Sequence, residues 1–298
     1  MRSSNPIFTR RGFRHGDGSG SPAADRPQPE RATVGAGLSG EPLTNPYAQP
    51  ATVPYTQPTT KPFAPGAQSD QGAMTIDDVV VRTAATLGTV VLTAVLSWVL
   101  LPVDSTGIGR SFAIGFGAAL VAFVLSMVQA FKRVPSPALI LGYAAFEGVF
   151  LGVISSATSE YIAPGVVIQA VLGTMAVSAG VLIAYKRRWI RVTRRFYGFV
   201  LGATVGFVLL MVVDLMFSAF GAGGGLGFDG GVGGVLFGLA GVLLGAAFLA
   251  LDFKQIEDGI AYGAPRDDSW FAAFGLTTTL VWIYLEALRV LSILQSDN

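Results

Sequence analysis

Seven apolar segments follow one another between residue 79 and the C-terminus, and each is long enough to cross a bilayer. About 20 apolar residues in a helix span the roughly 30 Å hydrocarbon core of a membrane. The chain is 51% hydrophobic and 13% charged, whereas a soluble domain carries about 25% charged residues. The sequence therefore predicts an all-α fold, a seven-transmembrane helical bundle. The expected spans are residues 79–102, 109–131, 138–157, 164–185, 196–220, 234–253 and 270–294.

The segment before the spans has a different composition, because residues 1–73 hold 11 of the 16 prolines. Across residues 42–62 a proline recurs at every fourth position. Such a segment buries too little apolar surface to fold by itself. We expect a disordered cytoplasmic tail, a candidate for binding a partner protein, followed by a membrane domain over residues 74–298. In "TIDD", Thr75 and Asp78 have the spacing of a capping box, which predicts that the first helix begins here.

Basic residues in the connections predict the orientation, since cytoplasmic loops of membrane proteins are enriched in Lys and Arg. The fourth-to-fifth connection, "KRRWIRVTRR", carries six basic residues, and its position favours contact with anionic lipid over nucleic acid. Two further connections on the same side carry Lys132, Arg133, Lys254 and Arg266, whereas the alternate connections hold only Arg110. We expect a cell-membrane protein with its N-terminus in the cytoplasm and its C-terminus outside.

The absence of cysteine and the single histidine, His15 in the tail, exclude thiolate and imidazole chemistry inside the spans. The stretch "GLGFDG" at residues 225–230 matches a dinucleotide fingerprint, but it lies in a loop between spans rather than after a strand. We therefore expect no cofactor and no fixed metal site. Carboxylates must carry any chemistry with protons or cations.

Five charged residues fall inside the apolar segments: Glu147, Asp214, Asp252, Glu286 and Arg289. A charge at the centre of a span costs about 2.5–3.5 kcal/mol, so such residues usually face the bundle interior and have a function. We expect Glu147 and Asp214 along an ion path, with Asp214 close enough to the outer end of its span to reach the interface. We also expect pairing of Glu286 with Arg289 three residues later. Two carboxylates on neighbouring spans cannot both ionise easily in low dielectric, so they would share a proton.

Three stretches carry a resemblance to a known family: "ALILGYAAFEGVFLGVIS" in the third span, "LDFKQI" closing the sixth and "IYLEALRVLSIL" in the seventh. From about residue 78 to the C-terminus the chain resembles the Bax inhibitor-1 family, which has bacterial members. The resemblance implies a calcium leak gated by protonation of an acidic pair. Carried over to this sequence, the pair is Asp252 and Glu286, which would also hold calcium transiently.

This chain departs from the family pattern, because Glu286 replaces an aspartate and 34 positions separate it from Asp252. The tail lies outside the resemblance. If the sixth helix ended at Asp252, Glu286 would lie about 24 Å further along the seventh, and contact would fail. If the helix continues to about Gly263, the offset falls to roughly 9 Å, which tilt and side-chain reach can close. Contact within the pair therefore requires a long sixth helix.

Three other functions compete with a calcium leak. An intramembrane aspartyl protease would need two aspartates, whereas the two contexts here read "ALDF" and "YLEA", so we expect no enzyme. A regulatory protein of a stress response or of membrane proteases would use the tail to bind its partner and would conduct no ions. A proton-coupled transporter would show saturable exchange instead of a passive leak.

Overall fold

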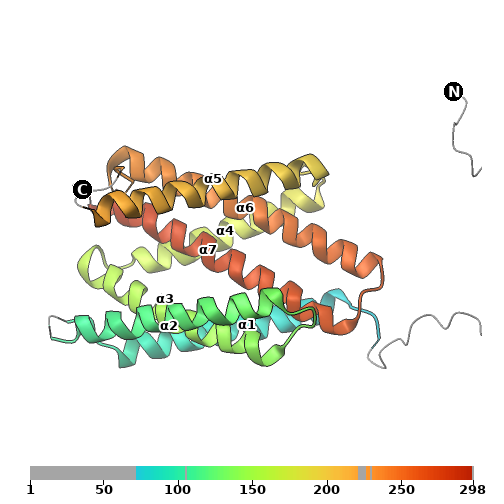
Figure 1. Ribbon diagram of the computed structural model, residues 1–298, viewed down its shortest axis with the longest axis horizontal. Helices are drawn as coiled ribbons and strands as arrows, with labels where there is room; N and C mark the ends of the chain where they lie inside the picture. Colours follow the sequence, from blue (N-terminus) through green and yellow to red (C-terminus); the bar gives the residue numbers. More distant parts are fainter. Residues whose placement is uncertain (1–71, 105, 221–225, 229, 297–298) are drawn as a thin grey trace, which may run out of the picture. The chain divides into compact units, whose positions relative to one another are not determined.

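The computed structural model describes residues 72–104, 106–220, 226–228 and 230–296, all within one unit, Lys61–Asn298 (Figure 1). In this part of the chain it contains seven helices that are long and apolar enough to cross a membrane, which confirms the predicted fold class. The expected tail lies outside the described residues, except for its last two positions. The helices are α1 (Ile76–Leu100), α2 (Ile108–Phe131), α3 (Pro137–Tyr161), α4 (Val166–Lys186), α5 (Arg194–Ala219), α6 (Gly231–Ala261) and α7 (Ser269–Ser296).

The first helix begins where the sequence predicts. The Thr75 hydroxyl accepts a hydrogen bond from the backbone N–H of Asp78, and the Asp78 carboxylate accepts one from the backbone N–H of Thr75. This capping box satisfies backbone donors that the first turn of a helix leaves without an internal partner. The start of α1 is therefore determined locally.

Helix α7 lies at the centre of the bundle. It packs against α1, α3, α4 and α6, whereas α2 packs on α3 and α5 packs on α6. In Figure 1 α7 (red) runs between the group formed by α1, α2 and α3 and the group formed by α4, α5 and α6. Buried side chains occur along the whole of α7, while α5 buries only Val200 and Phe207. A site on α7 is therefore held by several neighbours at once.

Glycines allow close helix packing on α3 and α6 but not on α5. A Cβ added at Gly148 would lie 2.4 Å from the carbonyl oxygen of Val90, and one at Gly152 would lie 2.3 Å from that of Ala94. These glycines let α3 approach the backbone of α1, as expected of small residues at four-residue spacing in lipid. The same spacing on α5 misleads, because Cβ atoms at its three glycines, Gly198, Gly202 and Gly206, would meet nothing within 4 Å.

The sixth helix is longer than its apolar run and ends at Ala261 rather than at residue 253. Its last two turns are polar but remain helical, and Lys254 forms an ion pair with Asp258 one turn later, at 2.7 Å. A short 3₁₀ turn, Arg266–Asp268, then leads directly into α7. The long sixth helix that contact between Asp252 and Glu286 requires is thus present, and the two helices form a tight antiparallel hairpin.

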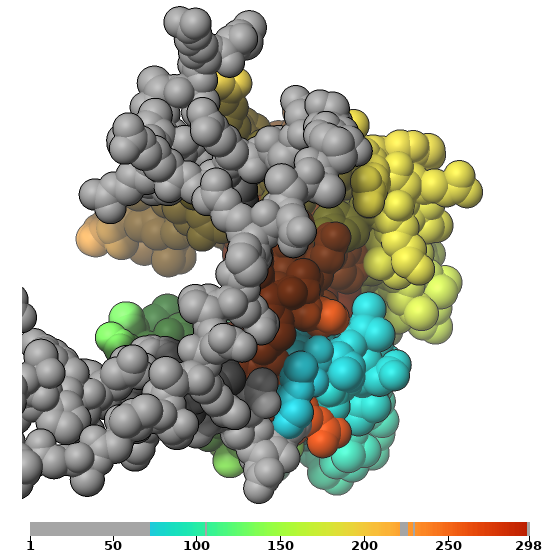
Figure 2. Space-filling model, turned by 90° about the vertical axis from the view of Figure 1, so that its right-hand side faces the viewer, coloured from blue at the N-terminus to red at the C-terminus, as the bar shows by residue number. Residues whose placement is uncertain are grey.

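The chain segment just before α1 lies on this hairpin. The backbone N–H of Met74 donates to the carbonyl oxygen of Ala264 (2.8 Å), and that of Arg266 donates to the carbonyl oxygen of Gly72 (3.2 Å). We call Gly72–Met74 the strap. Figure 2 views this end of the molecule, where the cyan start of α1 lies beside the orange turn between α6 and α7.

Candidate functional site

The Asp252 carboxylate lies between α6 and α7, at the end of the apolar run of α6. Its Oδ2 accepts a 2.7 Å hydrogen bond from the hydroxyl of Thr279 on α7. Its Oδ1 lies 3.3 Å from the position that a Cβ of Gly275 would occupy, so the absence of a side chain there leaves room for the carboxylate. The acid that ends the apolar run therefore faces the central helix and not the lipid.

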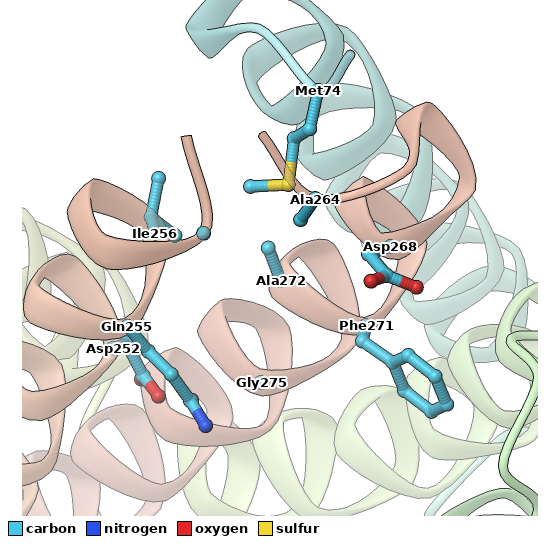
Figure 3. A pocket seen from close by; sticks show the side chains of 10 residues that line it. Met74, Asp252, Gln255, Ile256, Ala264, Asp268, Phe271, Ala272 and Gly275 are labelled. Atoms are coloured by element: carbon cyan, nitrogen blue, oxygen red, sulfur yellow. The ribbon is translucent and has the colours of Figure 1, made fainter. Parts of the chain in front are cut away.

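A cavity of about 390 Å³ opens beside this carboxylate, between α6, α7 and the strap. Figure 3 shows the side chains around it, with Asp252 on one wall and Asp268 on the other. These two acids are the charged residues of the lining, so the cavity offers a cation two carboxylates and no competing base. Its lining residues are Met74, Asp252, Gln255, Ile256, Gly259, Ala264, Asp268, Phe271, Ala272 and Gly275.

Met74 covers the cavity from the side of the strap, as Figure 3 shows. Only 4% of Met74 is exposed, and its Cε lies 3.6 Å from where a Cβ of Gly259 would be. It packs in one apolar cluster with residues of α6 and α7, among them Ile256 and Leu276. A residue that precedes the first helix therefore completes a site formed by the last two.

Glu286 lies further along α7 and is buried, with 6% of the residue exposed. It packs on Gly241 of α6, where an added Cβ would come within 2.6 Å of its Cδ. Arg289 approaches it at 3.8 Å, donates to the carbonyl oxygen of Phe228 at 2.6 Å and lies over the ring of Phe237. The expected pairing of Glu286 with Arg289 is present as this 3.8 Å approach, in which Oε2 of Glu286 accepts no hydrogen bond from any described residue.

The structure does not bring Asp252 and Glu286 together. The residue of α6 opposite Glu286 is Gly241, which lies 11 positions before Asp252. At 1.5 Å per residue the two acids are offset by about 16 Å along the helix pair. The expected offset of roughly 9 Å was too small, because the α6–α7 turn is tight and aligns Asp252 with Gly275 and Thr279.

The other two charged candidates have different surroundings. Glu147 is half-buried on α3, one turn beyond Tyr143. The ring of Tyr143 packs edge-on against Phe274 of α7, with the ring centroids 5.2 Å apart, so Glu147 belongs to the face of α3 near the central helix. Asp214 is half-buried on α5 and accepts a 2.6 Å hydrogen bond from the backbone of Leu226, so its side chain bonds to the loop after α5.

Two of three consecutive threonines of α7 hydrogen-bond to other helices. Thr277 bonds to Thr86 of α1 at 2.8 Å, and Thr279 bonds to the carboxylate on α6 described above, whereas Thr278 donates to the carbonyl oxygen of Phe274 within α7. Our sequence reasoning considered only charged residues and missed this group. The run "TTT" in the middle of an apolar span was the signal, because polar side chains at that depth tend to bond across helices.

A second cavity, of about 780 Å³, opens between α1 and α4 over α3 and α7. Its lining is apolar apart from hydroxyl groups such as that of Ser155, which bonds to Tyr284 at 2.6 Å. No carboxylate or base lines it, so it offers nothing to a proton or a cation. The cavity beside Asp252 is the better candidate site.

Comparison with known families supports the resemblance seen in the sequence. The family model described as "Bax inhibitor 1 like" matches residues 5–296. The match begins near the N-terminus and so includes the proline-rich segment, which the sequence analysis had placed outside the resemblance. No curated protein matches the chain. With seven helices of membrane-spanning length in its described part, the chain is a multi-pass membrane protein that belongs to the Bax inhibitor 1 like family.

Proposed function

We propose that this protein is a calcium leak that responds to pH, with Asp252 as the carboxylate that binds and releases the controlling proton. The observation that carries the proposal is the place of Asp252. It lies in an apolar helix, bonded to Thr279 and exposed to a cavity that carries a second acid, Asp268. Charged residues in spans usually mark ion or proton paths. The proposal is for ion conduction and not for an enzyme.

The sign of the pH response follows from the charge of Asp252. At low pH the protonated side chain is neutral and gives a calcium ion no electrostatic attraction. At higher pH the ionised side chain, together with Asp268, makes the cavity attractive to a divalent cation. A proton can shift an equilibrium between a non-conducting and a conducting state only if it binds the two states with different affinity. We therefore expect flux to rise as the pH increases.

Glu286 has a separate role in this proposal. Because it is offset from Asp252 along the hairpin, it acts as a second acid deeper in the bundle and not as the partner in one shared proton. Arg289 balances its charge at 3.8 Å. Glu147 lies on the face of α3 that meets the same central helix, and we propose that it lines the ion path between the level of Asp252 and the level of Glu286.

We also propose that the protein lies in the cell membrane and that the end of the bundle with the strap faces the cytoplasm. The connections at that end carry most of the basic residues of the loops. The chain lacks cysteine, so single cysteines report topology cleanly. A membrane-impermeant thiol reagent applied to intact cells should label Thr106→Cys, an exposed position between α1 and α2, and should leave Arg191→Cys unlabelled. The reverse labelling would invert the orientation.

Calcium flux into liposomes tests the function. Purified protein in vesicles loaded with a calcium dye should admit calcium faster at pH 8 than at pH 6. Asp252→Asn should flatten this difference, while Asp214→Asn, which alters an acid of the peripheral helix α5, should leave it unchanged. If protein-containing and empty vesicles take up calcium equally, the protein does not conduct, and a regulatory role through a partner protein takes precedence.

A further inference from the structure

The strap holds Met74 over the cavity by contacts that can be broken without unfolding a helix. Ala73 pairs with Pro265 in an isolated antiparallel bridge, flanked by the two backbone hydrogen bonds described above. Two ion pairs, Asp78–Arg266 at 2.7 Å and Arg82–Asp267 at 3.8 Å, join the start of α1 to the same turn, and the Arg266 and Asp267 side chains are 53% and 49% exposed. Exposed ion pairs contribute little to stability. The strap is therefore attached at a few points near the surface.

Met74 itself is suited to reversible closure. Its side chain is unbranched and flexible, and thioethers fill irregular apolar gaps without directional bonds. The apolar neighbours that it meets, such as Ile256 and Gly259, belong to α6 and so are held by that helix and not by the strap. Removal of Met74 opens the cavity on the side of the strap while the other walls remain.

We propose that Met74 is a removable plug and that displacement of the strap exposes the Asp252 cavity to water. The inference rests on the proposed function, since it names the element that controls access to the same site. The strap continues directly into the proline-rich segment, so a protein that binds this segment acts on the plug through the chain itself. With Met74 in place, Met74 itself is 4% exposed and the Asp252 side chain beside it is half-buried.

A reversible cross-link tests whether strap movement controls conduction. Ala73 and Pro265 form a non-hydrogen-bonded pair, whose Cα atoms are about 4.5 Å apart in antiparallel ladders, close enough for a disulfide. In the Ala73→Cys/Pro265→Cys variant, oxidation should lower calcium flux at pH 8, and a reducing agent should restore it. The single-cysteine variants should not respond to oxidation. Equal flux of the oxidised and reduced protein would overturn the proposal.

Thiol accessibility tests the plug without reference to calcium. Ala272 lines the cavity and is half-buried, so Ala272→Cys places the only thiol of the chain behind Met74. A water-soluble maleimide should label it slowly, and adding Met74→Ala should raise the labelling rate at least several-fold. Met74→Leu, which keeps the bulk, should label slowly, and so should Met127→Ala, which alters an exposed methionine of α2.

The two measurements separate failure of this inference from failure of the proposed function. Fast labelling with Met74 intact, at the rate of the Met74→Ala variant, would overturn the plug whatever the protein conducts. Slow labelling that Met74→Ala accelerates, in a protein that conducts no calcium, would support the plug and refute the leak.

Discussion

Thr279 on α7 donates a 2.7 Å hydrogen bond to the Asp252 carboxylate on α6, so the group that faces this acid in the membrane is a hydroxyl and not a second acid. Thr279 is itself only 9% exposed. A carboxylate in an apolar bundle needs a donor when it ionises, because burial without a hydrogen bond is costly. The Asp252–Thr279 pair is therefore the central element of the candidate site.

Replacement of Thr279 tests this pair. Thr279→Val keeps the shape but removes the donor, and leaving a buried polar group without its partner costs about 1–3 kcal/mol. We expect a lower temperature of thermal unfolding in detergent and an altered pH response of calcium flux. Thr279→Ser keeps the hydroxyl and should resemble the wild type in its pH response. If the valine and serine variants behave alike, the hydrogen bond does not matter.

Independent action of the two acids is a second prediction. Asp252 and Glu286 lie at different levels of the α6–α7 pair and share no partner. Effects at separate sites usually add to within about 0.3–0.5 kcal/mol. The change in unfolding free energy of the Asp252→Asn/Glu286→Gln double variant should thus equal the sum of the single changes. A double variant no more affected than either single variant would instead indicate a shared proton.

The close approach of α3 to α1 predicts a large effect at one glycine. In Gly148→Ala the new Cβ would lie 2.4 Å from the carbonyl oxygen of Val90, a backbone atom that cannot rotate away. Overpacking of this kind costs about 1–3 kcal/mol, which a thermal unfolding curve resolves. Gly173→Ala on α4 is the matched control, because its Cβ meets nothing within 4 Å. Equal unfolding temperatures for the two variants would contradict the observed packing.

The contact between Arg289 and Glu286 should contribute to the stability of the protein. Arg289→Met removes the guanidinium that lies 3.8 Å from the buried carboxylate and that donates to Phe228. Breaking a buried pair by removing one partner is more harmful than replacing both. The Glu286→Gln/Arg289→Met double variant should therefore unfold at a higher temperature than Arg289→Met alone. A double variant that is less stable than Arg289→Met would show that the two charges do not interact.

The loop between α1 and α2 gives a prediction for acid pH. The pKa of Asp104 is held below its usual value, first by the hydrogen bond from the backbone of Gly107 (2.7 Å) and then by the Thr106 side chain. Because its folded pKa is lowered, its stabilising effect is present above the usual value of 3.8 and is lost as the pH falls through the folded pKa. Amide exchange in the first turn of α2 should show this loss, and Asp104→Ala should show it already at neutral pH.

The sequence by itself determined the positions of the spans and those features that depend only on residues close together in the chain, such as the start of the first helix. Seven apolar runs predict seven helices, because a backbone in lipid must satisfy its hydrogen bonds within each segment. The capping box at Thr75 and Asp78 and the contact between Glu286 and Arg289 are likewise local, since each joins residues three positions apart. In all of these cases the interacting groups are neighbours in the chain, so spacing alone reveals them.

Only the tertiary structure decided which residues meet across helices. Hydropathy locates a helix but not its level against a neighbour, and the short turn at Arg266–Asp268 aligns Asp252 with Thr279 rather than with Glu286. The same holds for Met74, whose burial depends on a hairpin almost 200 positions later in the chain. A shift of one helix turn, about 5.4 Å, changes every such contact and leaves the apolar pattern of the spans unchanged.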